Sequence, residues 1–274
     1  MTAPVFILTP QTLEPAGAGV SASRGARLTL TGAEARHAVT VRRLRAGERV
    51  DLVDGAGLRL ICEVEEAGVQ GRKDQLGVRV VERVEEAPTA LRLTLVQALA
   101  KGDRDEQAVE TATEVGVDLV LPWQAERCVS VWKGLKAAKG RERWRSTVQE
   151  AAKQARRAWV PTVEEPHNTK QLCSWVAEVV QAGGVVLVLH EEATAPISSA
   201  PLPVLPAAPP QPGGAASPVL AVVVGPEGGI SAAETAALET AGAVTVRLGP
   251  HVMRTASAGP AALAVLAQRA GLWG

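Results

Sequence analysis

The sequence of 274 residues contains no tyrosine, a single phenylalanine, three cysteines and four histidines. The cysteines (Cys62, Cys128 and Cys173) are widely spaced and form no CxxC pair, and the histidines do not cluster. This distribution argues against a disulfide framework and against a metal centre. We therefore expect reduced, structural thiols and no metal ligands.

Long apolar runs are also absent. No segment is apolar for long enough to span a bilayer, and no basic stretch followed by an apolar one begins the chain. We therefore expect a soluble, cytoplasmic protein with no membrane partner. The chain has neither a G-x-G-x-x-G fingerprint nor a G-x-x-x-x-G-K-[ST] loop, which weighs against dinucleotide and ATP binding.

No excess of one charge is present, since 29 basic residues balance 29 acidic ones. Their distribution is uneven. Residues 133–160, the cation belt, contain nine basic and two acidic residues, whereas residues 161–274 contain four basic and eight acidic ones. A local belt of cations on an otherwise acidic body is typical of a phosphate-binding surface, although a solvated helix face has the same composition. Of the tryptophans that interleave with the belt (Trp132, Trp144 and Trp159), we expect at least one in the core.

Residues 1–86 are predicted to form a small β-barrel domain. Short apolar stretches punctuated by glycine predict strands at 5–8, 27–30, 50–53, 58–64 and 76–84, with one short helix at 34–44. Asp54-Gly55-Ala56-Gly57 lies between two of these stretches, and such a turn predicts a hairpin. Many short strands in so few residues favour a barrel.

Residues 90–274 alternate between strands and helices, which predicts an α/β domain with a parallel sheet. Strands are expected at 91–99, 119–122 and 185–189, and helices at 104–115 and 141–158. Residues 194–218 are rich in proline, alanine, serine and glycine, a composition that cannot bury enough surface to fold. We predict a flexible insert there, looped off the domain without a part in its chemistry.

Two glycine turns near the end of the chain are its most informative feature. The apolar strand 219–224 ends at Gly225-Pro226-Glu227-Gly228-Gly229, and a helix follows with Ser231 and Glu234 in the spacing of a capping box. The strand 244–247 ends at Leu248-Gly249-Pro250 and leads into an alanine-rich helix that reaches Arg269. Turns at the carboxyl ends of parallel strands favour a ligand site, and these two could wall the same pocket. Two ordinary strand-to-helix connections are the alternative.

The residues of these turns, VVVGPEGGIS and VRLGPHVMRTASA, resemble the C-terminal signature of the SPOUT methyltransferases. The closest resemblance is to the RsmE family, which methylates N3 of a uridine in small-subunit ribosomal RNA. It extends in order along nearly the whole chain, through His37 with 41–48, then 97–104, 112–117, Glu126-Arg127, Arg143-Trp144 and 150–154.

The resemblance implies an α/β fold: a SPOUT-type parallel sheet with a C-terminal trefoil knot in residues 219–274, joined to a PUA-like N-terminal domain that presents RNA. It also implies S-adenosylmethionine (S-adenosyl-L-methionine) as cofactor, held by backbone groups of tight turns that glycine lets approach closely. Glu227 would either hold its turn or contact a ribose hydroxyl, and His190 would equally suit a strand end with a backbone partner. The cofactor-binding residues implied here are Leu189, His190, Gly225, Glu227, Gly229, Ile230, Leu248, Gly249, Val252 and Met253.

Methylation at N3 requires loss of a weakly acidic proton, and a nearby cation would stabilise the uracil anion. Arg254 is the candidate for this role, but an arginine stays protonated and is a poor base. The family pattern R-x-E-T-A is Arg254-Thr255-Ala256-Ser257-Ala258 here, so Ala256 replaces the acidic residue. His251, which stands where the family has an arginine, is the candidate proton acceptor because neutral imidazole accepts protons near neutral pH.

The expected partners are small-subunit ribosomal RNA or the 30S subunit, and a second copy of the chain. SPOUT sites are generally completed by a second subunit, so we expect a homodimer packed through the alanines of 255–269. The alternatives are a SPOUT enzyme for tRNA, a non-catalytic RNA-binding assembly factor, which Ala256 would suit, and another kind of nucleotide-binding α/β enzyme. The candidates for RNA contacts are Arg24, Arg42, Arg43, Arg45, Arg143, Arg156 and Arg157.

Overall fold

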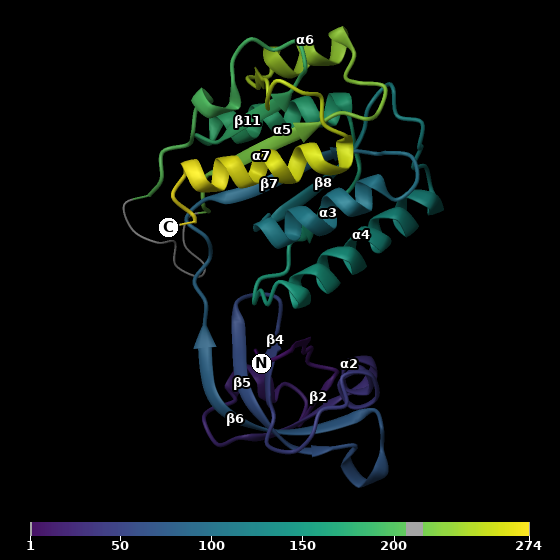
Figure 1. Cartoon of the computed structure of the whole chain (residues 1–274), viewed down its shortest axis with the longest axis vertical. Coiled ribbons are helices and arrows are strands. Elements are labelled where there is room, and N and C mark those ends of the chain that lie inside the picture. The colour runs from purple at the N-terminus through teal and green to yellow at the C-terminus, as the bar shows by residue number, and fades with distance from the viewer. Residues whose placement is uncertain (1, 207–215, 274) are drawn as a thin grey trace. The chain divides into compact units, whose positions relative to one another are not determined.

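The computed structural model describes residues 2–206 and 216–273. The chain divides into two compact units (Figure 1). Unit 1 comprises Met1–Ala87 and Ala152–Val160, and unit 2 comprises Pro88–Ala151 and Pro161–Gly274. Residues 152–160, inside the predicted methyltransferase domain, therefore belong to the compact unit formed by the N-terminal residues.

Unit 1 contains a curled six-stranded sheet in the order β1-β4-β5-β6-β3-β2. β1 and β4 are parallel, and the other neighbouring pairs are antiparallel. Register shifts after Ile61 and after Val64 bend the long β5–β6 pair, because a bulge increases the local twist. The elements are β1 (Val5–Ile7), β2 (Leu13–Glu14), α1 (Ala18–Ser21), β3 (Arg27–Thr31), α2 (Gly32–Arg36), a π-helical turn (His37–Val41), β4 (Arg49–Val53), β5 (Leu58–Ala67), η2 (Val69–Gly71) and β6 (Gln75–Glu85).

The core of unit 1 follows the alternation of its strands. Leu58, Leu60, Cys62 and Val64 are buried along β5 and alternate with more exposed residues, as expected for a sheet with one face inside. Phe6 packs edge-on against His37, with ring centroids 5.8 Å apart. The only phenylalanine and a histidine of the family-like block thus contribute to packing.

The predicted hairpin at 54–57 connects β4 and β5. Asp54 Oδ1 accepts hydrogen bonds from the backbone N–H groups of Ala56 (2.7 Å) and Leu58 (3.0 Å). Gly55 and Gly57 have φ angles of 78° and 103°, a left-handed conformation that glycine adopts without strain. The hairpin prediction is therefore confirmed.

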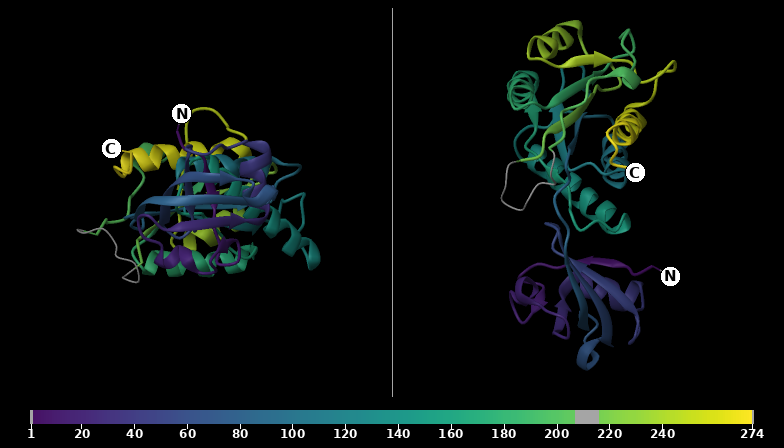
Figure 2. Two further views of the ribbon diagram at one scale, coloured as in Figure 1. Left: turned by 90° about the horizontal axis from the view of Figure 1, so that it is seen from below. Right: turned by 90° about the vertical axis from the view of Figure 1, so that its left-hand side faces the viewer.

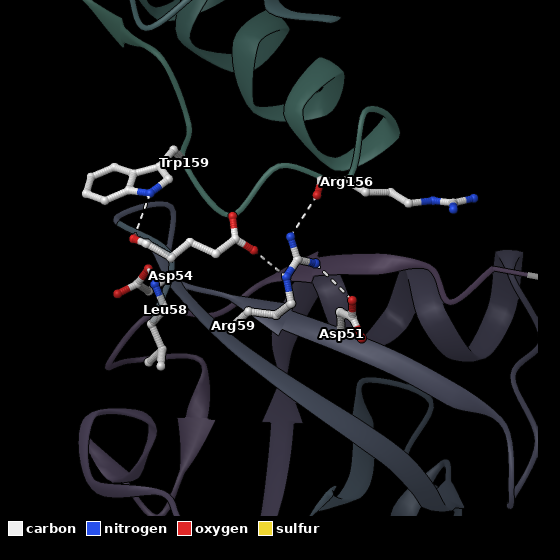
Figure 3. Close-up of polar contacts among 7 residues, drawn as sticks. Asp51, Asp54, Leu58, Arg59, Arg156 and Trp159 are labelled. Carbon is white, nitrogen blue, oxygen red and sulfur yellow. Dashed lines mark hydrogen bonds and ion pairs between the residues drawn. The ribbon is translucent and has the colours of Figure 1, made fainter. Parts of the chain in front are cut away.

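Residues 152–160 pack in unit 1 around the side chain of Arg59 (Figure 3). Its guanidinium donates to the carboxylates of Asp51 (2.9 Å) and Glu86 (2.7 Å) and to the backbone oxygen of Arg156 (2.8 Å). Trp159 Nε1 donates to the backbone oxygen of Glu86 (3.1 Å). Burial works to lower the pKa of Arg59, but its bonds to the two carboxylates outweigh burial and raise it. Through these bonds the charged side chain of Arg59, which we name the Arg59 clamp, holds residues 152–160 against the sheet of unit 1.

Unit 2 contains a parallel sheet in the order β10-β8-β7-β12-β11-β13, with β9 also paired to β8. The parallel α/β prediction is thus confirmed. The strands are β7 (Arg92–Ala98), β8 (Leu119–Gln124), β9 (Thr162–Val163), β10 (His167–Asn168), β11 (Val185–Leu189), β12 (Val219–Val224) and β13 (Val244–Val246). The helices are α3 (Arg104–Val115), α4 (Leu135–Gln154), α5 (Thr169–Gln181), η3 (Ile197–Ser199), α6 (Ala232–Thr240) and α7 (Thr255–Arg269).

Helices cover both faces of this sheet (Figure 2). α3 and α7 pack on one face, and α5 and α6 pack on the other. Residues on successive positions of β12 point to opposite faces, so that Ala221 and Val223 join the core beneath α5 and α6. Helix α5 is absent from the sequence prediction, although Asn168 and Gln171 form a capping box at its start.

The first part of the proline-rich segment 194–218 is packed against the domain. Ile197 and Ala200 are only 3% and 4% exposed, and Arg269 donates to the backbone oxygens of both at 2.8 Å. The prediction of a flexible insert is therefore wrong for this part, because Ile197 is buried and Arg269 holds the backbone there. Residues 207–215 of the predicted insert lie outside the described residues.

Helix α7 packs within its own unit. Ala258, Ala262 and Ala267 are buried, and the helix contacts α3, β7, β12 and η3. The prediction that the alanines form a surface for a second subunit is thus wrong for these three, because they allow close packing on the sheet instead. The predicted knot in 219–274, with the last helix threaded beneath a loop, stays a prediction.

The three cysteines are free. Burial raises the pKa of Cys62 to about 12 and that of Cys128 to about 11, so both thiols stay protonated near neutral pH. This agrees with the prediction of reduced structural thiols. Among the described residues, no helix combines the length and the apolar character needed to cross a membrane.

Candidate cofactor-binding site

A cavity of about 680 Å³ lies in unit 2 where β11, β12 and β13 end. These strands are neighbours in the sheet, so the turns that follow them meet although they are far apart in the sequence. The two glycine turns wall this one cavity, as the sequence predicted. Its lining includes all ten residues predicted to hold the cofactor, together with His251 and Arg254.

The first wall is the turn after β12. A Cβ at Gly225 would lie 2.6 Å from Cγ1 of Ile230, so glycine is required there for packing. Gly229 has a φ of 73°, which a residue with a side chain rarely adopts. Ser231 and Glu234 form the predicted capping box at the start of α6.

The carboxylate of Glu234 also ties this wall to two other segments. It accepts hydrogen bonds from the backbone N–H of Glu126 (2.8 Å) and the hydroxyl of Thr169 (2.7 Å). Beside it, the guanidinium of Arg127 donates to the backbone oxygen of Gly228 (3.1 Å). The Glu126-Arg127 block therefore supports the turn.

Glu227 holds its turn against the segment that follows β7. Its carboxylate accepts hydrogen bonds from the backbone N–H of Lys101 (3.2 Å) and the guanidinium of Arg104 (2.9 Å). Burial works to raise the pKa of Glu227, but hydrogen bonds from its own backbone N–H, from Lys101 and from Arg104 outweigh burial and lower the pKa. These bonds favour the turn-holding role over the ribose contact.

The second wall consists of residues 248–254. Among the described residues, no atom beyond Gly249 and its two chain neighbours lies within 4 Å of a Cβ added to Gly249. Val252 and Met253 are 78% and 42% exposed, and His251 and Arg254 are exposed as well. Arg254 is the N-cap residue of α7. The apolar, imidazole and guanidinium groups of this wall are therefore exposed, because no other described segment covers them.

His190 lines the cavity but also has backbone partners. Its N–H donates to the oxygen of Val246 (3.0 Å), and its Nδ1 accepts from the N–H of Glu192 (3.2 Å). These contacts are those of a strand-end residue with backbone partners, which is the alternative role. His190 nevertheless lines the cavity and would lie beside a ligand bound there.

The arginines predicted to contact RNA lie in both units. In unit 1, Arg24, Arg42, Arg43 and Arg45 are exposed. Arg156 is also exposed there, with a φ of 58°, and its side chain points away from the Arg59 clamp (Figure 3). Arg157 is half-buried in unit 1, and Arg143 lies on α4 in unit 2.

The cation belt is less positive than its residue count indicates. Lys153 Nζ lies 2.8 Å from Glu34 Oε1 in unit 1, and Arg143 Nε lies 2.6 Å from Glu106 Oε1 in unit 2. Arg141 pairs with Glu165. All three acids lie outside 133–160, so a count over that segment misses them. Trp132 and Trp144 are buried against each other, with ring centroids 5.2 Å apart, which confirms that the belt contributes to the core.

The cavity suits S-adenosylmethionine in size and chemistry. Its volume lies in the range of small-molecule sites. Glycine turns and apolar side chains form most of the wall, and the open space at Gly249 allows backbone to approach a ligand. Glu227, Arg104 and Arg254 add charges of both signs at the lining, which suits a ligand that carries both.

Comparisons with known proteins identify the family of the chain. The family model of the RNA methyltransferase domain matches residues 86–267, and that of the RNA methyltransferase PUA domain matches residues 30–70. Ribosomal RNA small subunit methyltransferase E of Mycobacterium tuberculosis is 46% identical over 249 residues, which are 91% of this chain and 89% of that protein. The chain belongs to the ribosomal RNA small subunit methyltransferase E family.

Two solved structures have the same architecture as this family member. A protein from Legionella pneumophila with bound S-adenosylmethionine is 26% identical, with a TM-score of 0.75 and 98% of each chain covered. Methyltransferase E from Neisseria gonorrhoeae, also bound to S-adenosylmethionine, has a TM-score of 0.77 at 24% identity, again over 98% of each chain. The SPOUT-type α/β fold with a PUA-like domain is therefore shown.

Proposed function

We propose that the protein transfers a methyl group from S-adenosylmethionine to N3 of a uridine in small-subunit ribosomal RNA. The observation that carries the proposal is the gathering of both glycine turns, His251 and Arg254 around one cavity in a member of the ribosomal RNA small subunit methyltransferase E family. An rRNA substrate implies action in the cytoplasm, where small subunits are assembled.

The cofactor, when bound, supplies an activated methyl group on a sulfonium. We assign its binding to the ten cofactor-binding residues that line the cavity. The bonds from Lys101 and Arg104 to Glu227 keep the first turn in place, and Gly249 admits the ligand along the second. A site held in shape before binding loses less entropy when the ligand is ordered.

The uracil base would be oriented by the exposed end of the second wall. The guanidinium of Arg254 stabilises the negative charge that develops on the base as the N3 proton leaves. His251 accepts that proton in its neutral form, since it stands in the same short loop and Ala256 offers no carboxylate. A base paired in a helix hides its N3 edge, so the uridine must be unpaired on entry.

The RNA backbone would contact exposed arginines of unit 1 (Arg24, Arg42, Arg43, Arg45 and Arg156) together with Arg157 and Arg143 of the belt. Each phosphate contact releases counterions, so binding should weaken with salt. The pairing of Arg143 with Glu106 reduces its share of this attraction.

A homodimer is part of the proposal, with a surface that differs from the one predicted. Since three alanines of α7 are buried within unit 2, a partner would instead cover the exposed apolar side chains Val252 and Met253 at the cavity and Val265 on α7. Exposed apolar groups beside a ligand site favour an interface there. A monomeric mass in solution, measured by light scattering, would contradict this part.

The reaction itself is tested by label transfer. The protein is incubated with methyl-labelled S-adenosylmethionine and with one of three acceptors: small ribosomal subunits, naked small-subunit rRNA or bulk tRNA. We expect label in a small-subunit acceptor and none in tRNA. Label in tRNA alone would favour a different RNA substrate, and cofactor binding without transfer to any acceptor would contradict catalysis.

A further inference from the structure

Gln97 is a fully buried polar residue that the reaction described above does not use. It lies near the end of β7, opposite Val224 in the neighbouring strand β12. Its Nε2 donates to the hydroxyl of Thr255 (2.8 Å) and to the backbone oxygen of Ala98 (3.1 Å). The amide thus links the centre of the sheet to the first residue of α7.

Thr255 passes this link on to the first glycine turn. Its hydroxyl, which accepts from Gln97, donates to the backbone oxygen of Gly225 at 3.0 Å. Thr255 is 7% exposed and is adjacent to Arg254. Gln97, Thr255 and Gly225, which we name the relay, therefore connect three segments: β7, the turn after β12 and the start of α7.

Stability alone does not account for the relay. The Oε1 atom of Gln97 is buried without a hydrogen-bond partner among the described residues, and such an atom destabilises a fold. An apolar side chain of similar size would avoid this cost. The close approach of α7 at Gly259, where a Cβ would lie 2.7 Å from Leu95, brings Thr255 within reach of the amide.

The geometry points to Gln97 and Thr255 as positioning residues that hold Arg254 at a fixed place relative to the cofactor turn. Thr255 is one of the residues that line the cavity, whereas Gln97 is not, so Gln97 acts through Thr255. The inference rests on the proposed function, because the role that it gives the relay is to align the methyl donor with the uracil base. Misalignment affects the transfer step more than ground-state binding.

The test replaces each member of the pair by an apolar residue of similar size. Thr255→Val and Gln97→Met should each lower kcat about tenfold, the equivalent of about one buried hydrogen bond, while the KM for S-adenosylmethionine changes less than about threefold. Thr255→Ser keeps the hydroxyl and should restore kcat. The double variant should be no slower than the slower single variant, because both break the same connection.

Thr94→Val is the matched control. Thr94 lies on the same strand, is fully buried, and its hydroxyl has no hydrogen-bond partner among the described residues. This variant should keep kcat and melt at the same or a higher temperature. If Thr255→Val loses the fold, Gln97→Met alone, which leaves Thr255 in place and removes the amide donor, tests the same link.

Two results would overturn the relay. One is a Thr255→Val enzyme with the kcat of the Thr94→Val control. The other is a raised KM for S-adenosylmethionine with kcat unchanged, which would make the pair part of cofactor binding. If the parent protein transfers no methyl group at all, the proposed function fails, and the relay fails with it.

Discussion

Replacing Gly249 by valine should weaken cofactor binding strongly and leave the fold intact. Gly249 lines the cavity, and apart from its own chain neighbours no described residue has an atom within 4 Å of the position that its Cβ would take. The new side chain therefore enters open space next to the ligand. Gly225→Val would be a poorer test, because its Cβ would lie 2.6 Å from Ile230 and disturb the turn itself.

The size of both effects, on stability and on cofactor affinity, follows from these contacts. With no protein atom to displace, the free energy of unfolding should change by no more than about 0.5 kcal/mol. Valine adds three carbon atoms to glycine. In the complex with the cofactor, these atoms overfill a packed site, which costs about 1–3 kcal/mol of binding free energy. That range corresponds to a dissociation constant raised by about 5- to 150-fold.

Isothermal titration calorimetry with S-adenosylmethionine measures this change, and the melting temperature reports the fold. Gly249→Ala, with one added carbon, should bind with intermediate affinity. A Gly249→Val protein that binds the cofactor as tightly as the parent would refute the reasoning and place the cradle elsewhere.

Further predictions concern catalysis, RNA binding and stability. Arg254→Ala should lower kcat by about 100-fold while calorimetry shows nearly unchanged cofactor affinity, because the guanidinium acts on the developing charge of the base; equal loss of both would contradict this role. Arg42→Gln and Arg156→Asn should each weaken RNA binding and reduce the slope of log K against log salt by about one, and an unchanged slope would remove that residue from the interface. Ile197→Ala should lower the free energy of unfolding by about 2–4 kcal/mol, whereas Val204→Ala, at a side chain 90% exposed in the same segment, should change it little in denaturant titrations. Burial raises the pKa of Asp105 to about 6, so its ionisation opposes folding and its contribution to stability is lost as pH rises from about 4 to 6. Thermal melts of Asp105→Asn should lack this component, and an unaltered pH profile would show that another group is responsible.

Much of the site could be predicted from the sequence because its residues sit in two short turns. Gly225 directly follows β12, and Gly249 lies three residues beyond the end of β13. Neighbouring parallel strands place such turns together. The contribution of Arg104 was harder to predict, since it depends on an ion pair with Glu227 across 123 residues of sequence. The relay from Gln97 to Thr255 spans 158 residues and has no local signal.

The errors in the fold prediction have a common cause. Composition described 194–218 as unable to fold, yet Ile197 and Arg269 anchor its first part through contacts far along the chain. A charge count over 133–160 could not include Glu34 or Glu106, which pair with Lys153 and Arg143. Local patterns predict strands, turns and caps, whereas pairing between distant segments decides which charges stay exposed.

The most direct test of the proposed function is the position of the methyl group on the RNA. Small-subunit rRNA treated with the protein and S-adenosylmethionine is digested to nucleosides and analysed by mass spectrometry against synthetic standards, with the Arg254→Ala protein as control. The account predicts N3-methyluridine with the parent protein and little with the variant. A methyl group on another atom of the base or on the ribose 2′-hydroxyl would contradict it.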